Sequence, residues 1–146
     1  MLNTIFDIAA SAMSANRLRI NTIASNIANA MTTRTEEGGP YKRRDVVFSA
    51  TDVHAHNGFD SALDKASLKN VKVSQVVTDQ SPPRMVYDPG HPDADPTNGM
   101  VAMPNVNQVT EMVNMIGASA AYKAAAEVAN ITKTMAQSLQ RLAQRF

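Results

Sequence analysis

The first stretch of the sequence decides the fold. From Leu2 to Ala30 it reads LNTIFDIAASAMSANRLRINTIASNIANA. Apolar side chains recur in it at alternating steps of four and three residues, which is typical of one face of a long helix. The stripe consists of Leu2, Phe6, Ala9, Met13, Ile20, Ile23, Ile27 and Ala30, with the polar Asn16 in one position. No glycine precedes Gly38 and no proline precedes Pro40, so no strong breaker interrupts the predicted helix.

The last part of the chain repeats this pattern. Its stripe consists of Val109, Val113, Ile116, Ala120, Ala124, Val128, Ile131, Met135, Leu139, Leu142 and Phe146. The mean step is close to 3.7 residues, against 3.5 in the first stripe, and indicates a straighter helix. Pro104 and Asn105 provide a start signal. Gly117 is the internal breaker, and it leaves room for another backbone to approach.

The middle of the chain predicts short strands. Runs rich in β-branched residues occupy 45–50, 68–77, 84–87 and 100–103, and the segments 80–83 and 88–99 are rich in turn residues. We therefore expect an α+β fold, in which long terminal amphipathic helices form a coiled-coil-like domain around a small β-rich insert. The predicted segments are an N-terminal assembly helix (1–34), a β-rich middle (35–103) and a C-terminal assembly helix (104–146).

Composition excludes several classes of function. The 146 residues carry a formal net charge of +1, which disfavours a broad nucleic-acid surface. No cysteine is present, so disulfides and thiolate metal sites are excluded. The start lacks basic residues, and Asp7 interrupts its apolar run, so we expect no cleaved signal peptide. No run of about 18 apolar residues predicts a membrane span.

The histidines raise two alternatives. His54 and His56, two residues apart and near Asp52, could bind a metal on one strand face, but no further ligand follows at a recognisable spacing. His91 lies among Asp88, Asp93 and Asp95, where acid–base catalysis is conceivable. Prolines and a glycine make a rigid turn with capping carboxylates the better interpretation. We expect no enzyme activity, no metal, no cofactor and no small-molecule substrate.

The basic triplet Lys42–Arg44 has an anion-binding alternative too. It is short and is balanced by Glu36, Glu37 and Asp45. A solvated turn or an ion-paired contact between subunits is therefore the preferred interpretation.

The two stripes could form the core of an ordinary monomer. About 70 residues separate them, however, and Asn26 and Asn29 lie on one helical face, where amides can fix the register between helices. We therefore expect the stripes to be covered by neighbouring subunits.

Several motifs along the whole chain resemble the FlgC family of flagellar basal-body rod proteins. They are Ile5-Phe-Asp-Ile-Ala, Ala24-Ser-Asn-Ile-Ala-Asn-Ala, Pro40-Tyr-Lys-Arg-Arg-Asp-Val-Val-Phe, Tyr87-Asp-Pro-Gly-His-Pro-Asp-Ala-Asp, Met103-Pro-Asn-Val-Asn and Glu111-Met-Val-Asn-Met-Ile. The resemblance implies a subunit of the proximal rod, a tube across the periplasm. It also implies export through the flagellar type III apparatus without a cleaved signal, and ends that fold on assembly.

The expected partners are other rod subunits, copies of the same chain and the export apparatus. The alternatives are another flagellar axial protein, an export adaptor that binds axial proteins, and a metal-dependent enzyme that uses the histidines. The predicted assembly residues are Phe6, Met13, Ile20, Ile23, Asn26, Ile27, Asn29, Val113, Ile116, Val128, Ile131 and Met135.

Overall fold

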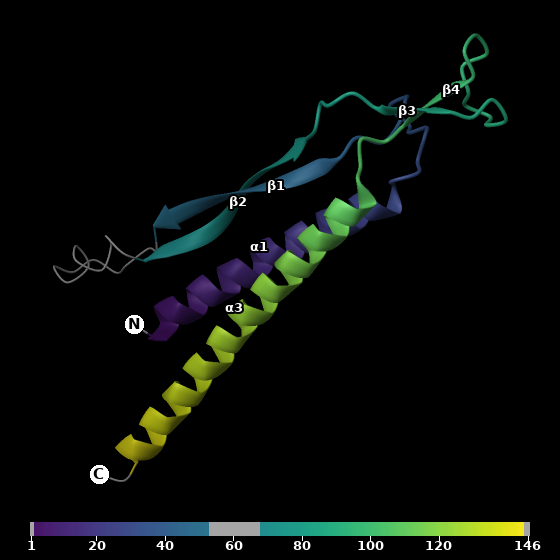
Figure 1. Ribbon diagram of the computed structural model, residues 1–146. Helices are drawn as coiled ribbons and strands as arrows, with labels where there is room; N and C mark the ends of the chain where they lie inside the picture. Colours follow the sequence, from purple (N-terminus) through teal and green to yellow (C-terminus); the bar gives the residue numbers. More distant parts are fainter. Residues whose placement is uncertain (1, 53–67, 145–146) are drawn as a thin grey trace. The chain divides into compact units, whose positions relative to one another are not determined.

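A computed structural model describes residues 2–52 and 68–144. The elements follow the order α1 (Leu2–Ala28), β1 (Arg44–Asp52), β2 (Lys69–Thr78), β3 (Arg84–Tyr87), β4 (Met100–Met103) and α3 (Gln108–Ala143) (Figure 1). The predicted α+β class and the four predicted strands are confirmed. Both helices are shorter than predicted, because α1 ends in a turn at residues 29–31 and α3 begins four residues after Pro104.

Backbone contacts divide the chain into two compact units. Unit 1 comprises Met1–Leu18, Val47–Gln75 and Ala118–Phe146, and unit 2 comprises Arg19–Val46 and Val76–Gly117. Each unit therefore takes residues from both long helices and from the middle of the chain. Among the described residues, neither helix is long and apolar enough to cross a membrane.

Unit 1 joins a strand pair to α1. β1 and β2 are hydrogen-bonded neighbours that run in opposite directions (Figure 1). The Val71 N–H donates a hydrogen bond to Ser11 Oγ (3.2 Å) and so attaches β2 to the helix. Lys69 and Asp52 form an ion pair across the strands. The buried positions on the helices of this unit hold small side chains: Ala9, Ala15, Ala118 and Thr132.

Unit 2 contains a β-hairpin with a long, self-capped loop. β3 and β4 pair antiparallel, with Val86 opposite Val101, and Val101 is fully buried. In the loop, side chains of Asp88 and Asp95 accept hydrogen bonds from backbone N–H groups two residues further on. The predicted capping by carboxylates is confirmed. The loop closes at Gly99, which has a positive φ of 67°.

A polar side chain, Asn26, holds the centre of unit 2. It is fully buried, and its amide nitrogen donates to Glu111 Oε2 (2.8 Å) and to the Arg44 carbonyl (2.7 Å). Its amide oxygen accepts hydrogen bonds from the Tyr41 hydroxyl (3.0 Å) and from the Arg44 N–H (3.0 Å). An asparagine side chain has two donor hydrogens and two acceptor lone pairs, so all four are used. Asn26 thus links α1, the segment before β1, and α3.

The second buried group of this network is Glu111, which is 1% exposed. Its Oε1 accepts hydrogen bonds from Arg43 Nε (2.9 Å) and from Asn114 Nδ2 (3.2 Å). Burial of the guanidinium acts to lower the pKa of Arg43, but the hydrogen bonds and charges of Glu111 and Asp45 outweigh burial and raise it. Arg43 therefore stays charged, and the carboxylate is paired and hydrogen-bonded, as a buried charge must be.

Two asparagines position the start of α3. Asn107 caps the helix, because its Oδ1 accepts hydrogen bonds from the N–H groups of Val109 (3.0 Å) and Thr110 (3.2 Å). Asn105, the predicted start signal, instead accepts a hydrogen bond from the Arg43 N–H (2.8 Å) and donates to the carbonyls of Asp79 and Ser81. The prediction of the start residue was wrong, because Asn105 bonds to distant segments of the chain.

We predict that Asn26→Ala lowers the free energy of unfolding by about 3–5 kcal/mol, since it leaves the buried Glu111 and its neighbours without their partner. Asn29→Ala is the matched control. Its side chain is part-exposed and bonds only to the local Ser25 carbonyl and the Thr32 hydroxyl, so the loss should stay near 1 kcal/mol or below. Urea titration followed by circular dichroism measures both, and equal losses would contradict the central role of Asn26.

A glycine pair provides the second stability prediction. An added Cβ at Gly99 would lie 2.9 Å from the Tyr87 ring, and the φ of Gly99 is positive, so Gly99→Ala should cost about 1–3 kcal/mol. A Cβ at Gly117, inside α3, meets no atom within 4 Å. Gly117→Ala should therefore stabilise the free chain by up to about 1 kcal/mol. Thermal unfolding distinguishes these opposite signs, and a stabilising Gly99→Ala would show that the loop is not constrained as described.

Candidate assembly surface

The two faces of α3 differ in chemistry. The side chains buried on it are Glu111 in unit 2 and Ala118 and Thr132 in unit 1. The large apolar side chains lie on the exposed face: Val109, Val113 and Ile116 in unit 2 are 62–70% exposed, and Val128, Ile131, Met135, Leu139 and Leu142 in unit 1 are 45–56% exposed. We call these eight residues, with the exposed Ala120 and Ala124, the α3 stripe. A helix that buries its small and polar side and exposes its apolar side is a candidate interaction surface.

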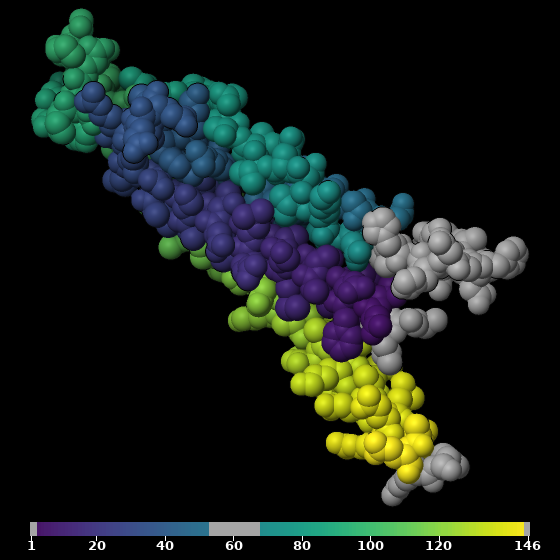
Figure 2. Space-filling view, turned by 180° about the vertical axis from the view of Figure 1, so that it is seen from behind, coloured from purple at the N-terminus to yellow at the C-terminus, as the bar shows by residue number. Residues whose placement is uncertain are grey.

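The second half of the α3 stripe is hollowed. Ile131, Met135 and Leu139 line a depression of about 460 Å³, with Glu127, Asn130, Thr134 and Ser138 along its polar side. In the last turns of α3, all side chains from Gln137 to Gln144 are exposed. Figure 2 shows these last turns, in yellow, as the C-terminal end of α3. This part of the helix has apolar side chains that the rest of the described chain does not cover.

The stripe of α1 is different, because the chain itself covers most of it. Ile23, Ala9 and Ala30 are 3–4% exposed. The other predicted assembly residues of this stripe, Phe6, Met13, Ile20 and Ile27, are half-buried. The chain itself thus covers much of the α1 stripe and leaves the α3 stripe exposed, and contact of either stripe with other subunits stays a prediction. The sequence alone did not distinguish them, because both stripes have the same apolar periodicity.

The two asparagines predicted to fix helix register have separate surroundings. Asn26 does connect two helices, but both belong to the same chain. Asn29 lies in the turn after α1, where its Nδ2 donates to the Ser25 carbonyl (2.9 Å) and its Oδ1 accepts from the Thr32 hydroxyl (3.1 Å). Neither amide extends from the chain as a free register-setting group.

The basic triplet divides into three environments. Arg43 pairs with Glu111 and Asp45 inside unit 2, so its charge is neutralised within the chain. Lys42 donates to the exposed Gln80 side chain (3.3 Å). The Arg44 guanidinium lies 6.0 Å from the centre of the Tyr41 ring, at the limit of a cation–π contact.

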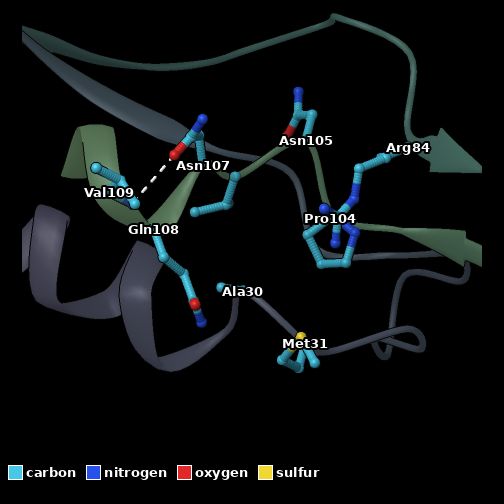
Figure 3. Close-up of a pocket in the computed structure, with 9 residues that line it drawn as sticks. Ala30, Met31, Arg84, Pro104, Asn105, Asn107, Gln108 and Val109 are labelled. Carbon is cyan, nitrogen blue, oxygen red and sulfur yellow. Dashed lines mark hydrogen bonds between the residues drawn. The ribbon is translucent and has the colours of Figure 1, made fainter. Parts of the chain in front are cut away.

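A second hollow, of about 420 Å³, lies in unit 2 where α1 ends and α3 begins (Figure 3). Its lining comes from Ala30, Met31, Arg84, Pro104, Asn105, Val106, Asn107, Gln108 and Val109. Arg84 is the one titratable side chain among these nine residues, so the hollow itself provides no acid–base pair or nucleophile. The dashed bond in Figure 3 is the Asn107 cap on Val109.

The histidine alternatives gain no support from the described residues. His54 and His56 lie outside them. The ring Nδ1 of His91 accepts a hydrogen bond from the Asp93 N–H (3.0 Å), which makes it part of the turn. Within residues 2–52 and 68–144, no group of three or more histidine, aspartate or glutamate side chains could hold a metal ion.

Sequence reasoning missed the residues that hold unit 2 together, above all Glu111, Arg43 and Tyr41. Glu111 lies in the first turn of α3, where an acidic residue is the ordinary complement of the helix dipole. Arg43 lies in a charge-balanced run. Their pairing spans 68 residues of sequence, and no local spacing indicates a contact at that separation.

Comparison with known proteins places this arrangement in a family. Residues 6–34 match the family model "Flagella basal body rod protein", and residues 97–142 match "Flagellar basal body rod FlgEFG protein C-terminal". Flagellar basal-body rod protein FlgC of Salmonella typhimurium is 45% identical over 134 residues, which cover 92% of each chain. The protein of that name in Borreliella burgdorferi is 41% identical over 138 residues, 90% of this chain and 91% of the relative. The chain belongs to the FlgC family of flagellar basal-body rod proteins.

Proposed function

We propose that this chain is a structural subunit of the flagellar basal-body rod and that it assembles through its terminal helices. The observation that carries the proposal is the α3 stripe, whose large apolar side chains are about half exposed or more in a helix that buries alanine and threonine instead. The FlgC name of its relatives supports a role in the rod. The predicted assembly residues on α3, Val113, Ile116, Val128, Ile131 and Met135, all belong to this stripe.

The predicted residues on α1 act in this proposal through the fold of the subunit. Phe6, Met13, Ile20, Ile23 and Ile27 pack within the chain. Asn26 holds the buried hydrogen-bond network of unit 2, and Asn29 stabilises the turn that follows α1. A subunit of a rotating rod must resist shear, and a buried, fully hydrogen-bonded connection between its two helices is suited to that load.

The remaining parts of the proposal follow from membership in the family. The partners are other rod subunits and copies of this chain, and the place of action is the proximal rod, which crosses the periplasm and transmits torque. Export proceeds unfolded through the flagellar type III apparatus, without a cleaved signal peptide. The role is mechanical, with no catalysis, cofactor or metal.

We predict that Ile131→Glu abolishes incorporation into the rod and swimming, while the free subunit keeps its helix content and unfolding midpoint. Ile131 is 52% exposed, so a charge there costs the free chain little but disrupts an apolar contact with a neighbour. Gln137→Glu is the matched control, because it introduces the same residue on the same helix at an exposed position off the stripe. Swimming in soft agar and immunoblots of purified basal bodies provide the measurements. Normal rods in the Ile131→Glu strain would contradict the proposal.

Ile23→Asp should abolish motility for another reason. Ile23 is 3% exposed, so an aspartate there destabilises the subunit itself, by several kcal/mol. The unfolding midpoint of the purified chain therefore distinguishes the two variants. Ile23→Asp lowers it, whereas Ile131→Glu leaves it unchanged. A well-folded Ile23→Asp protein that still fails to assemble would assign α1 a direct contact with other subunits.

The export-adaptor alternative has a direct test, because an adaptor would bind axial proteins only transiently. A rod subunit remains in purified basal bodies after detergent and salt extraction, whereas an adaptor is lost from them.

The metal-dependent enzyme is tested by replacing His54, His56 and His91 together with asparagine. We expect normal swimming, because His91 serves only its own turn. Loss of swimming with normal levels of the chain in basal bodies would favour the enzyme.

A further inference from the structure

Asn98 and Gly99 form the dipeptide that closes the loop between β3 and β4 (Figure 1). The turn explains the choice of residues, because Gly99 has a positive φ of 67° and its carbonyl accepts a hydrogen bond from the Asp88 N–H (3.0 Å). The same pair has a chemical reactivity. Glycine has no side chain to shield its backbone nitrogen, so the asparagine before it readily loses its side-chain amide.

This deamidation needs only the dipeptide and water. The Gly99 nitrogen gives up its proton and attacks Asn98 Cγ, a C–N bond forms, and the side-chain nitrogen leaves as ammonia with a proton. Water then opens the cyclic succinimide at either of its carbonyls. One opening leaves aspartate at position 98, and the other leaves isoaspartate, whose main chain runs through the former side chain and is longer by a methylene.

The folded hairpin restrains both reacting groups. The Gly99 N–H donates a hydrogen bond to the Asp95 carbonyl (2.8 Å), so the nitrogen holds its proton and is a poor nucleophile. The Asn98 Oδ1 accepts a hydrogen bond from the Met100 N–H (2.8 Å), which fixes the side-chain amide and polarises its carbonyl. The carbonyl is thus prepared for attack, while the nucleophile is blocked. The reaction therefore requires the loop to open at Gly99.

Packing and hydrogen bonds around Gly99 oppose this opening. A Cβ added to Gly99 would lie 2.9 Å from Tyr87 Cε2 and 3.3 Å from Pro89 Cβ, so both side chains pack directly on the glycine. The Asp95 N–H donates to the Met100 carbonyl (2.9 Å), and Met100 lies opposite Tyr87 in the β3–β4 ladder. Opening at Gly99 therefore means local unfolding of the hairpin loop, and only the opened molecules can react.

We propose that Asn98–Gly99 is a latent modification site, at which deamidation proceeds in the unfolded chain and is blocked in the folded subunit. The modification then marks chains that have remained unfolded. Isoaspartate also prevents the loop from closing, because its extra methylene lies inside both turns that Asp95 forms with Gly99 and Met100. The aspartate product is tolerated, since its carboxylate oxygen still accepts the Met100 N–H. The chemistry needs only this chain and water, whichever neighbours the subunit meets.

Peptide mass mapping of the purified full chain tests the site. The chain is kept in a mildly alkaline buffer with or without guanidinium chloride, circular dichroism verifies its folding state, and the loss of the Asn98 amide is followed with time. Asn57 also precedes a glycine, lies outside the described residues and serves as the reference in denaturant. We expect Asn98 to react at the rate of Asn57 in denaturant, and more slowly by about tenfold or more in the folded chain.

Two results would overturn the proposal. Equal rates of amide loss at Asn98 in the folded and the denatured chain would show that the hairpin does not block the reaction. An intact Asn98 in denaturant, with Asn57 deamidated, would show that the dipeptide is not a modification site.

A pair of variants on β3 tests the packing on Gly99. Tyr87→Ala removes the ring beside the glycine and should raise the rate of amide loss in the folded chain by about threefold or more. Met85→Ala is the matched control, because Met85 is also exposed, lies on the same face of β3 and has Ala102 as its ladder partner. Its rate should equal that of the unmodified chain. Equal rates in the two variants would contradict the role assigned to Tyr87.

The two products are distinguished by their effect on folding. Asn98→Asp copies the aspartate product and should keep an unfolding midpoint close to that of the unmodified chain. Chains aged in denaturant, with Asn57→Gln to remove the other Asn-Gly pair, accumulate isoaspartate at position 98 and should refold with a lower midpoint. An unchanged midpoint in the isoaspartate-containing chains would show that the turn accepts the longer main chain.

Discussion

The structure of unit 2 depends on one buried polar contact, the hydrogen bond from Asn26 to Glu111. It joins the two long helices across 85 residues of sequence. A buried carboxylate is tolerated only when it is paired and hydrogen-bonded, and Arg43 and Asn114 complete that requirement. Because the pair accepts little displacement, it fixes the rotation of α3 about its own axis at Glu111. The side of α3 that bears Glu111 faces inward, and the side that bears Val113 and Ile116 faces outward.

Within unit 2, that rotation explains why the first turns of α3 expose their apolar side. A helix oriented by hydrophobic burial alone would turn its isoleucines and leucines inward. Here the inward positions are Glu111, Ala118 and Thr132, which allow close approach or form specific bonds. In the proposed assembly, burial of the stripe is left to contacts with other copies or other rod subunits. The hydrophobic energy of assembly, roughly 25 cal/mol for each Å² of apolar surface covered, is then available only to a folded subunit that meets its neighbours.

The sequence predicted the elements well and their orientation poorly. Periodicity identified both long helices, and β-branched runs identified the four strands, because these are local signals. The sequence did not indicate which face of each helix the chain covers. The stripes of α1 and α3 look alike, yet Ile23 is buried and Ile131 is exposed. The deciding contacts join Asn26, Arg43 and Glu111, and spacing in sequence does not indicate such distant pairs. The apolar positions of α3 named as assembly residues were identified from periodicity alone, and their exposure is information that only the structure adds.

The rate at which a thiol reagent modifies Ile131→Cys tests the central claim most directly. This side chain is exposed in the subunit and, on this account, covered in the rod. A maleimide should label the purified variant rapidly, and labelling in intact basal bodies should be strongly suppressed and recover when the rods are dissociated. Equal labelling of free and assembled protein would show that the α3 stripe is not the surface through which the subunits join.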